Sequence, residues 1–489
     1  MSLTEDVPLS PAYIDTLTTE SIVELLRSIV VPGRSRRSRF TNWGLTYTCV
    51  PLTIFEPETI DQCSLVLELA RREGRRLRFA GIGHSPSDLA CTSEYMLRTT
   101  KLNRVLQVDT EKRFVIAQGG IILNDLHACL AKHGLAMSNL GSISDQTLAG
   151  VVSTATHGSG VTFGVLSTMV LELELMLADG SVVTCSDSSR PELFKASLCG
   201  LGATGLILSI KLKVEPAFLL KDEQDTIDFG SFIDDFDNLI SSAEHTRFWW
   251  FVQNDLVRTS ALNRTREDRK LTGSWVWNSF FGYHVIQFLL FLGRFWLFLN
   301  TWTGIFAEWL MRGKTVNIDD SHKVFNVDCR YPQYTTEWAI PLNNAPKCLV
   351  RLREWVNKEY ADPKGIRPHF PIEIRFTEAD DIWLSPSYGQ RMCWIGLIQF
   401  KPYGFNVPYR RFFTEFERIA SELHGKPHWA KTHTLRPAEL RLLYPKFPDF
   451  VKVLENVDPA GLFRNEYVRR HIFGETGEGV HGRIFKRRA

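Results

Sequence analysis

The chain has 489 residues, of which 44% are hydrophobic and 23% are charged, and its formal net charge is +2. At roughly 150 residues per domain, this length predicts two or three folded domains. The composition excludes a disordered chain, a collagen-like repeat and a small disulfide-stapled scaffold. The nearly balanced charge argues against nucleic acid, which we do not expect as a partner.

The nine cysteines are scattered along the chain, odd in number and without a C-x-x-C pair. This pattern indicates reduced thiols in an intracellular protein, and it supplies neither a zinc site nor a disulfide framework. We therefore expect no bound metal. The N-terminus does not combine a charged start, an apolar core and a small-residue cleavage site, so we expect no secretory signal.

Residues 1–39 are expected to form an N-terminal helix and a basic linker. Apolar residues recur at helical spacing from Glu20 to Val31, and Pro32 and Gly33 end the pattern. The basic run from Arg34 to Arg39 is interpreted as a solvated arm and not as a targeting signal.

Residues 40–216 alternate short β-rich runs with helical ones, which predicts an α+β domain with mixed sheets. Residues 217–457 predict a second α+β domain, interrupted by a nearly uncharged insert at 271–315. Residues 458–489 are expected to return to the first domain. The clearest expected elements are strands at 75–81, 112–120, 171–177, 206–214, 371–379 and 393–400, and helices at 123–134 and 410–425.

The segment from Gly200 to Gly205 matches the dinucleotide pattern G-x-G-x-x-G. In a Rossmann fold a strand precedes this pattern and a helix follows it, because the pyrophosphate lies at the N-terminus of that helix. Here a helix-like segment precedes the glycines and a strand-like segment follows them. We therefore reject a Rossmann domain. The sequence also lacks G-x-x-x-x-G-K-S/T, which excludes a P-loop ATPase.

Two other segments are better candidates for holding a phosphorylated ligand. RFAGIGHSPSD (78–88) ends a strand in a glycine-rich turn, whose successive backbone N–H groups can cradle a pyrophosphate. LGSISDQTLAGVVSTATHGSG (140–160) has few bulky residues, so its backbone can lie against a flat or phosphorylated ligand. Either segment alone would also fit a surface turn. Two in one domain, each beside a histidine, favour a ligand site.

These segments resemble the FAD-binding domain of the vanillyl-alcohol-oxidase-type flavoproteins, and within them the sugar-1,4-lactone oxidases that act on D-arabinono-1,4-lactone or L-gulonolactone. The resemblance implies an α+β fold with a two-part, PCMH-type FAD-binding domain at 40–216. It also implies a substrate (cap) domain with an antiparallel sheet at 217–457. The resemblance continues at 372–389, 426–431 and 458–467.

The resemblance implies that FAD is the cofactor and that His84 carries a covalent bond to the 8α-methyl group of the flavin. Plant-type dehydrogenase relatives lack this histidine, so its presence favours the oxidases. His157 is expected to shape the loop beside the flavin. The other residues expected to bind FAD are Gly81, Ile82, Gly83, Ser85, Pro86, Gly141, Ser142, Gly150, Ser153, Thr154, Thr156, Gly158 and Ile207.

Glu373, Arg375 and Lys431 are the expected catalytic residues. Glu373 and Arg375 are two positions apart on an expected strand, so both side chains face one side of a sheet. An ion pair on a solvated face would explain them, but alternating apolar residues indicate that the opposite face is buried. The resemblance implies that the charged face looks onto the flavin, where Arg375 and Lys431 polarise substrate oxygens and Glu373 binds hydroxyls or assists the proton. Trp429 is interpreted as a packing residue.

The implied reaction oxidises the C2 hydroxyl of a sugar 1,4-lactone to an ascorbate-type product, while molecular oxygen is reduced to hydrogen peroxide. D-arabinono-1,4-lactone is the favoured substrate, with L-gulono- and L-galactono-1,4-lactone also accepted. An aldonolactone dehydrogenase that uses cytochrome c and an alditol oxidase remain alternatives. A non-catalytic, membrane-attached binding protein is a third. No motif distinguishes the lactone stereoisomers.

Residues 275–311 are rich in aromatic side chains and contain only Arg294 and Glu308 as charged residues. The uncharged stretch 271–293 is long enough for a membrane span. A single span would, however, place the FAD domain and Lys431 on opposite sides of the bilayer. Two alternatives remain for this segment: a hairpin buried in the core, or an in-plane, monotopic insertion into a membrane. The many tryptophans favour insertion at the headgroup boundary. We expect attachment to an intracellular membrane, with the mitochondrial membrane favoured over the endoplasmic reticulum.

Overall fold

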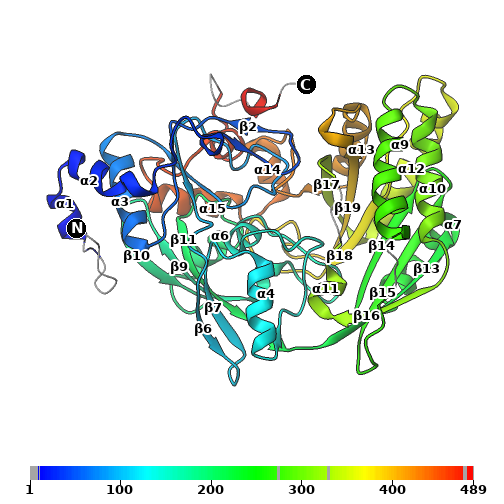
Figure 1. The fold of residues 1–489 in the computed structure, drawn as a ribbon, viewed down its shortest axis with the longest axis horizontal. Coiled ribbons are helices and arrows are strands. Elements are labelled where there is room, and N and C mark those ends of the chain that lie inside the picture. Colours follow the sequence, from blue (N-terminus) through cyan, green and yellow to red (C-terminus); the bar gives the residue numbers. More distant parts are fainter. Residues whose placement is uncertain (1–8, 10, 272–275, 328–330, 477–481, 488–489) are drawn as a thin grey trace.

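The computed structural model describes residues 9, 11–271, 276–327, 331–476 and 482–487. The chain forms two parts (Figure 1), the first on the left of the view and the second, built around a large sheet, on the right. One cluster of buried apolar side chains includes Val115 and Phe194 of the first part and Trp250 and Phe412 of the second. The two parts therefore share a continuous interior.

The first part contains a parallel and an antiparallel sheet, which confirms the mixed sheets predicted for this region. The parallel sheet has the order β3-β5-β4, and α3 forms the crossover from β3 to β4. The antiparallel sheet has the order β10-β9-β11-β7-β6. These elements are β3 (Thr53–Phe55), α3 (Ile60–Arg72), β4 (Leu77–Ala80), β5 (Tyr95–Arg98), β6 (Val105–Asp109), β7 (Phe114–Gln118), β9 (Val170–Met176), β10 (Val182–Cys185) and β11 (Leu206–Lys213).

Short elements complete the first part around these sheets. The glycine run 200–205 lies after α6 and before β11. A helix therefore precedes it and a strand follows it, which is the reverse of a Rossmann motif and confirms the prediction. The remaining elements are β1 (Phe40–Thr41), β2 (Thr48–Cys49), α4 (Leu123–Lys132), β8 (Leu135–Ala136), α5 (Leu148–Ser153), α6 (Pro191–Ser197) and β12 (Glu215–Pro216).

The N-terminal segment packs on the first part through α1 (Pro11–Thr16) and α2 (Thr19–Leu26). Ile22 of α2 is buried in one cluster with Val66 of α3. The arginines of the basic run that follows are exposed, as expected for a solvated arm. Arg37 also forms an ion pair with the buried carboxylate of Glu56, so the run is held to the first part at this point.

The second part is an eight-stranded antiparallel sheet in the order β16-β13-β15-β14-β18-β19-β17-β20. This confirms the antiparallel cap sheet. Helices cover one face of it: α12 and α13 pack on β17, and Phe376 of β18 contacts Phe236 of α8. The elements are β13 (Leu219–Asp228), α7 (Phe229–Asp234), α8 (Phe236–Ile240), β14 (His245–Phe251), β15 (Leu256–Thr265), β16 (Thr315–Asp320), α11 (Ser321–Phe325), β17 (Gln333–Pro341), α12 (Ala345–Ala361), β18 (Ile372–Thr377), β19 (Met392–Phe400), α13 (Arg410–Glu422) and β20 (Lys426–Pro427).

The insert forms a helical hairpin, residues 276–311, which we call the aromatic hairpin. A π-helix (Val276–Val285) runs into α9 (Ile286–Leu292), and α10 (Phe298–Met311) returns beside it at the right edge of Figure 1. Leu290 and Ala307 are buried against the second sheet, so part of the hairpin belongs to the core. Among the described residues, no helix is both long and apolar enough to cross a membrane. The large apolar side chains that the aromatic hairpin exposes are Trp277, Phe280, Phe288, Phe295, Trp296, Leu297, Phe298, Trp302, Trp309 and Met311.

The C-terminal helices return to the first part through α14 (Pro437–Leu443), α15 (Phe447–Val457) and α16 (Glu466–His471). α15 contacts α6, so the return begins before residue 458. The side-chain amide of Asn465 donates to the backbone carbonyls of Leu89 and Cys91, at 2.9 Å each. The C-terminal region thereby holds the segment that directly follows the glycine-rich loop.

Candidate active site

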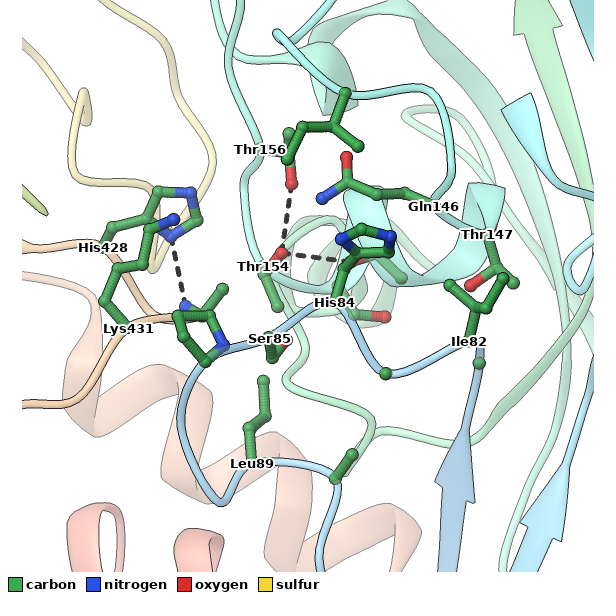
Figure 2. A pocket seen from close by; sticks show the side chains of 18 of the residues that line it. Ile82, His84, Ser85, Leu89, Gln146, Thr147, Thr154, Thr156, His428 and Lys431 are labelled. Atoms are coloured by element: carbon green, nitrogen blue, oxygen red, sulfur yellow. Dashed lines mark hydrogen bonds between the residues drawn. The ribbon is translucent and has the colours of Figure 1, made fainter. Parts of the chain in front are cut away.

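A cavity of about 210 Å³ lies between the two parts. Its walls come from the two glycine-rich segments of the first part and from strands β17, β18 and β19 of the second. Figure 2 shows His84 and Lys431 on facing sides of it. All three expected catalytic residues line the cavity, and so do all the expected cofactor residues except Gly158. A Cβ on Gly158 would lie 2.1 Å from Asn139 Oδ1, so glycine is required there for close packing behind the cavity wall.

Glycines allow the two segments of the first part to approach each other closely. A Cβ on Gly81 of the first segment would lie 2.3 Å from Thr147 Oγ1 of the second. Within the second segment, a Cβ on Gly150 would lie 2.9 Å from the same atom. Gly83 has a φ of +88°, which favours glycine. Within the described chain, the backbone N–H groups of residues 81–85 donate no hydrogen bond to the protein. They form a cradle that fits the pyrophosphate of FAD.

His84 enters the cavity from this glycine-rich loop (Figure 2). Its ring stacks on Trp43, with centroids 5.4 Å apart and planes inclined by 20°. Burial lowers the pKa of His84 to about 4, so the imidazole is neutral at neutral pH. Its Nδ1 atom is buried and has no hydrogen-bond partner in the described part of the chain. A neutral imidazole with an unpaired nitrogen is the nucleophilic form of histidine.

Strands β17, β18 and β19 present one face to the cavity. Side chains alternate along a strand, and the register places Gly396 between Glu337 on one side and Glu373 on the other. Because glycine has no side chain, a gap opens between the two carboxyl groups. The other residues that line the cavity from these strands are Gln333, Thr335, Arg375 and Ile398.

Glu373 and Arg375 meet Ser142 of the first part at this junction. The Ser142 hydroxyl donates to Glu373 Oε1 at 3.1 Å, and Arg375 Nη1 donates to Ser142 Oγ at 3.3 Å. Arg375 Nη2 lies 2.9 Å from Glu337 Oε1 and 3.4 Å from Glu373 Oε2. The guanidinium is therefore held between two carboxylates, in contact with both parts of the chain.

Lys431 follows β20 in a turn in which its own N–H donates to the carbonyl of His428 at 2.8 Å. Its Nζ atom lies 3.5 Å from Glu337 Oε2. Trp429 lies between His428 and Lys431 in the sequence and is fully buried. Its indole N–H donates to the backbone carbonyl of Leu384 at 2.7 Å. The structure thus confirms that Trp429 is a packing residue of the core. Lys431 lines the cavity.

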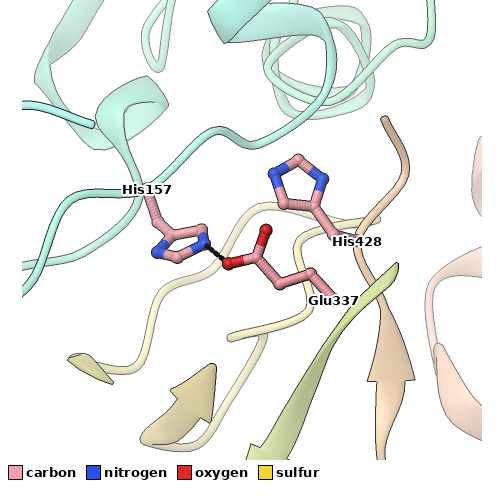
Figure 3. Close-up of side chains that lie close together, drawn as sticks. All are labelled: His157, Glu337 and His428. Atoms are coloured by element: carbon pink, nitrogen blue, oxygen red, sulfur yellow. Dashed lines mark hydrogen bonds and ion pairs between the residues drawn. The ribbon is translucent and has the colours of Figure 1, made fainter. Parts of the chain in front are cut away.

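Glu337 is a charged residue of the site that sequence reasoning missed. Figure 3 shows its carboxylate between His157 and His428, and His157 Nε2 lies 3.1 Å from Oε1. Burial would raise the pKa of Glu337, but the cations of Arg375 and Lys431 and the bond from His157 hold it well below its usual value. Burial lowers the pKa of both histidines. An ionised carboxylate therefore lies beside two neutral imidazoles.

The ligand atoms of His157, Glu337 and His428 lie within 4.8 Å of one another, a spacing at which three groups can hold a metal ion. The two oxygens of Glu337, however, already face cations, Arg375 at 2.9 Å and Lys431 at 3.5 Å. These charges oppose a further cation. We assign the three residues to the charge network of the cavity, and the expected absence of a metal stays a prediction.

Glu337 and Gly396 each left a weak signal in the sequence. Residues 333, 335 and 337 place Gln, Thr and Glu at alternate positions of a strand, a pattern that also describes a solvated edge. Gly396 interrupts an otherwise apolar strand, which often marks a close approach of a ligand or of another backbone. Neither signal identifies the strand that lies alongside.

The fold is shared with solved structures of cholesterol oxidases. A cholesterol oxidase from Brevibacterium sterolicum superposes with a TM-score of 0.74 at 14% identity, covering 89% of this chain and 97% of that one. At this identity the likeness concerns the fold alone. The family model described as FAD binding domain matches residues 51–186. The protein is therefore a flavoprotein with a PCMH-type FAD-binding domain, as predicted.

A second family model, described as D-arabinono-1,4-lactone oxidase, matches residues 210–471. An L-gulonolactone oxidase from Scyliorhinus torazame is 38% identical over 436 residues, which cover 89% of this chain and 98% of the relative. A D-arabinono-1,4-lactone oxidase from Eremothecium gossypii is 30% identical over 464 residues, 84% of this chain and 86% of the relative. The chain belongs to the D-arabinono-1,4-lactone oxidase family, and it is an FAD-dependent oxidoreductase.

Proposed function

We propose that the protein is an aldonolactone oxidase that oxidises the C2 hydroxyl of a sugar 1,4-lactone to an ascorbate-type product. D-arabinono-1,4-lactone is favoured, and L-gulono- and L-galactono-1,4-lactone are also accepted. The observation that carries this proposal is the position of Arg375 and Lys431, which reach one cavity opposite the glycine cradle with Glu373 beside them. Two cations and a carboxylate suit a ligand with a carbonyl and several hydroxyl groups.

FAD, when bound, would supply the acceptor for the C2 hydride, and its reoxidation by molecular oxygen, with two electrons and two protons, would give hydrogen peroxide. The residues of the chain bind and orient the lactone. Arg375 and Lys431 donate hydrogen bonds to its oxygens and stabilise the negative charge that develops as the hydroxyl proton leaves. Glu373, oriented by its 3.1 Å bond from Ser142, accepts hydrogen bonds from substrate hydroxyls or takes up the proton that leaves.

We also propose that FAD is bound covalently through His84. The proposal is supported by the neutral ring, the unpaired Nδ1 atom and the stacking of the ring on Trp43. A histidyl bond to the 8α-methyl group withdraws electrons from the flavin, which favours hydride acceptance.

We further propose that the aromatic hairpin attaches the protein to a membrane by monotopic insertion. The two charged side chains of the hairpin are bonded to other groups of the protein. Arg294 Nε donates to the carbonyl of Asn406 at 3.0 Å. The buried Glu308 accepts from Asn254 at 2.9 Å and from Arg312 at 3.0 Å. Its exposed aromatic side chains suit the headgroup boundary. We propose an intracellular membrane, mitochondrial in preference to endoplasmic reticulum, and the free thiols of the described cysteines agree with a reducing compartment.

The decisive experiment mixes the purified protein anaerobically with each of the three lactones and follows the flavin absorbance. Bleaching by lactones, followed by rapid recovery and hydrogen peroxide on admission of oxygen, is the expected result. Reaction with xylitol or sorbitol but not with lactones would identify an alditol oxidase. Slow recovery in oxygen with fast reduction of cytochrome c would identify a dehydrogenase. A flavin that no donor bleaches would contradict the enzyme and favour a binding protein.

A further inference from the structure

Glu337 occupies a rigid position in the roof of the cavity. It lies on β17, which pairs with β19 on one side and β20 on the other, so its backbone is fixed from both directions. Only 4% of the residue is exposed, and its carboxylate faces the cavity. A charged group on a strand that is paired on both sides holds its place more accurately than one on a loop.

The carboxylate of Glu337 contacts donor groups from three separate segments of the chain. Oε1 accepts from Arg375 Nη2 at 2.9 Å and from His157 Nε2 at 3.1 Å, and Oε2 lies 3.5 Å from Lys431 Nζ. Arg375 comes from β18, and Lys431 comes from the turn after β20. His157 comes from the first part, and Figure 3 shows its ring beside the Glu337 carboxylate. The His157 ring is itself fixed by stacking on Trp394, with centroids 3.8 Å apart.

Arg375 and Lys431 carry like charges, and Glu337 lies between them. Like charges in a partly buried cavity repel each other strongly, so the two side chains would separate if no anion joined them. Glu373 does not substitute for Glu337, because among the described ion pairs it joins Arg375 but not Lys431. The geometry of the cation pair therefore depends on Glu337.

We propose that Glu337 is a positioning residue for lactone oxidation: it holds Arg375 and Lys431 at the spacing at which both donate to oxygens of one substrate molecule, and it balances their charge. This inference rests on the proposed function. Both oxygens of Glu337 already face donors of the chain. Glu337 therefore acts through the two cations and not on the substrate itself.

The test is Glu337→Gln, which keeps the size of the side chain and removes its charge. We expect kcat with D-arabinono-1,4-lactone to fall about 100-fold, the order of loss seen when one preorganised electrostatic contact is removed. Bound FAD should be unchanged, because the glycine cradle belongs to the first part. The cavity also gains one positive charge, so inorganic sulfate should inhibit competitively at a concentration at least tenfold lower than in the wild type. A purely structural role would not strengthen sulfate binding.

Glu417→Gln is the matched control. Glu417 on α13 is a partly buried carboxyl beside β17, and its Oε1 accepts from Thr336 Oγ1 at 2.9 Å. Burial raises its pKa to about 7, so Glu417→Gln removes a carboxyl that is only partly ionised at neutral pH. This variant should keep the kcat and the sulfate inhibition of the wild type.

The proposal is overturned if Glu337→Gln keeps the wild-type kcat and sulfate inhibition. If Glu337→Gln loses FAD, the second variant is Glu337→Asp, which keeps the negative charge. Glu337→Asp must then retain FAD and at least a tenth of the wild-type kcat. If it does not, the proposal is overturned. A wild-type protein that no lactone reduces contradicts the proposed function instead, whatever the variants do.

Discussion

Gly396 on β19 lies directly across from Glu337 on β17, and a Cβ at position 396 would come within 3.7 Å of the Glu337 carboxyl carbon. This is an ordinary van der Waals distance, so the strand can accept a small side chain. The space that the side chain would occupy lies in the cavity, between Glu337 and Glu373. The absence of a side chain therefore determines how much room a ligand has beneath the sheet.

Gly396→Ala should raise the KM for the lactone about tenfold, a loss of about 1.4 kcal/mol in binding. The added methyl group takes space from the ligand, whereas FAD content and the midpoint of thermal unfolding should not change. Steady-state kinetics and the absorbance of bound flavin provide the measurement. Gly33→Ala is the control, because no atom lies within 4 Å of a Cβ there. An unchanged KM would show that the ligand does not use this gap.

Lys431→Met should slow flavin reduction by the lactone about 100-fold, because it removes a positive charge aimed at the reacting oxygens. FAD content should stay near the wild-type value, since Lys431 comes from the cap side of the cavity. Anaerobic stopped-flow absorbance measures the rate. The same substitution at the exposed Lys452 is the control. Equal rates in Lys431→Met and wild type would remove this residue from the site.

His84→Ala should abolish covalent attachment of FAD. Acid-precipitated wild-type protein should retain its flavin fluorescence in the pellet, whereas the variant should release its flavin into the supernatant. His133→Ala, which changes an exposed histidine away from the cavity, should behave as wild type. Complete release of FAD from the precipitated wild type would contradict the covalent bond, though not the binding site.

His369 should make the protein less stable in acid. Its Nδ1 accepts from the N–H of Phe400 at 2.9 Å, and burial lowers its pKa to about 3. The unfolded chain, with a pKa of about 6.5, binds one more proton between these values, so the free energy of unfolding falls as the pH drops, by up to about 1.4 kcal/mol per pH unit. In His369→Asn, whose amide oxygen can accept the same bond, the unfolding midpoint should fall less between pH 7 and pH 5. An equal fall in both proteins would contradict this.

The parts of the site that were predictable from sequence are those encoded by local pattern. The glycine-rich loop around His84 is a local turn, and Glu373 and Arg375 share a face because alternation along one strand dictates it. Glu337 was missed because it meets Arg375 only through strand order, with β19 between β17 and β18. Such non-local pairing follows from the packing of the whole sheet and not from the residues near position 337.

The aromatic hairpin combines two roles that its sequence could not separate. Leu290 and Ala307 are buried in one cluster with Phe251 of β14, while Phe295 and Trp302 are exposed. The apolar composition of the hairpin therefore serves the core on one side and leaves exposed aromatic rings elsewhere. Deletion of residues 275–311 would remove both, so it does not test membrane attachment cleanly.

Substitution of exposed side chains alone separates these roles. Phe295, Phe298 and Trp302 are 63%, 58% and 65% exposed, and changing all three to Ser should leave the fold and the FAD content intact. The wild type should float with liposomes and resist release by high salt, because its attachment rests on apolar burial, and detergent should release it. The triple variant should remain in the aqueous fraction. Leu442→Ser, at a position 87% exposed on α14, controls for the loss of any surface apolar group and should still float. Wild-type protein that stays soluble without detergent and does not bind liposomes would show that these aromatic side chains do not anchor the protein to a membrane.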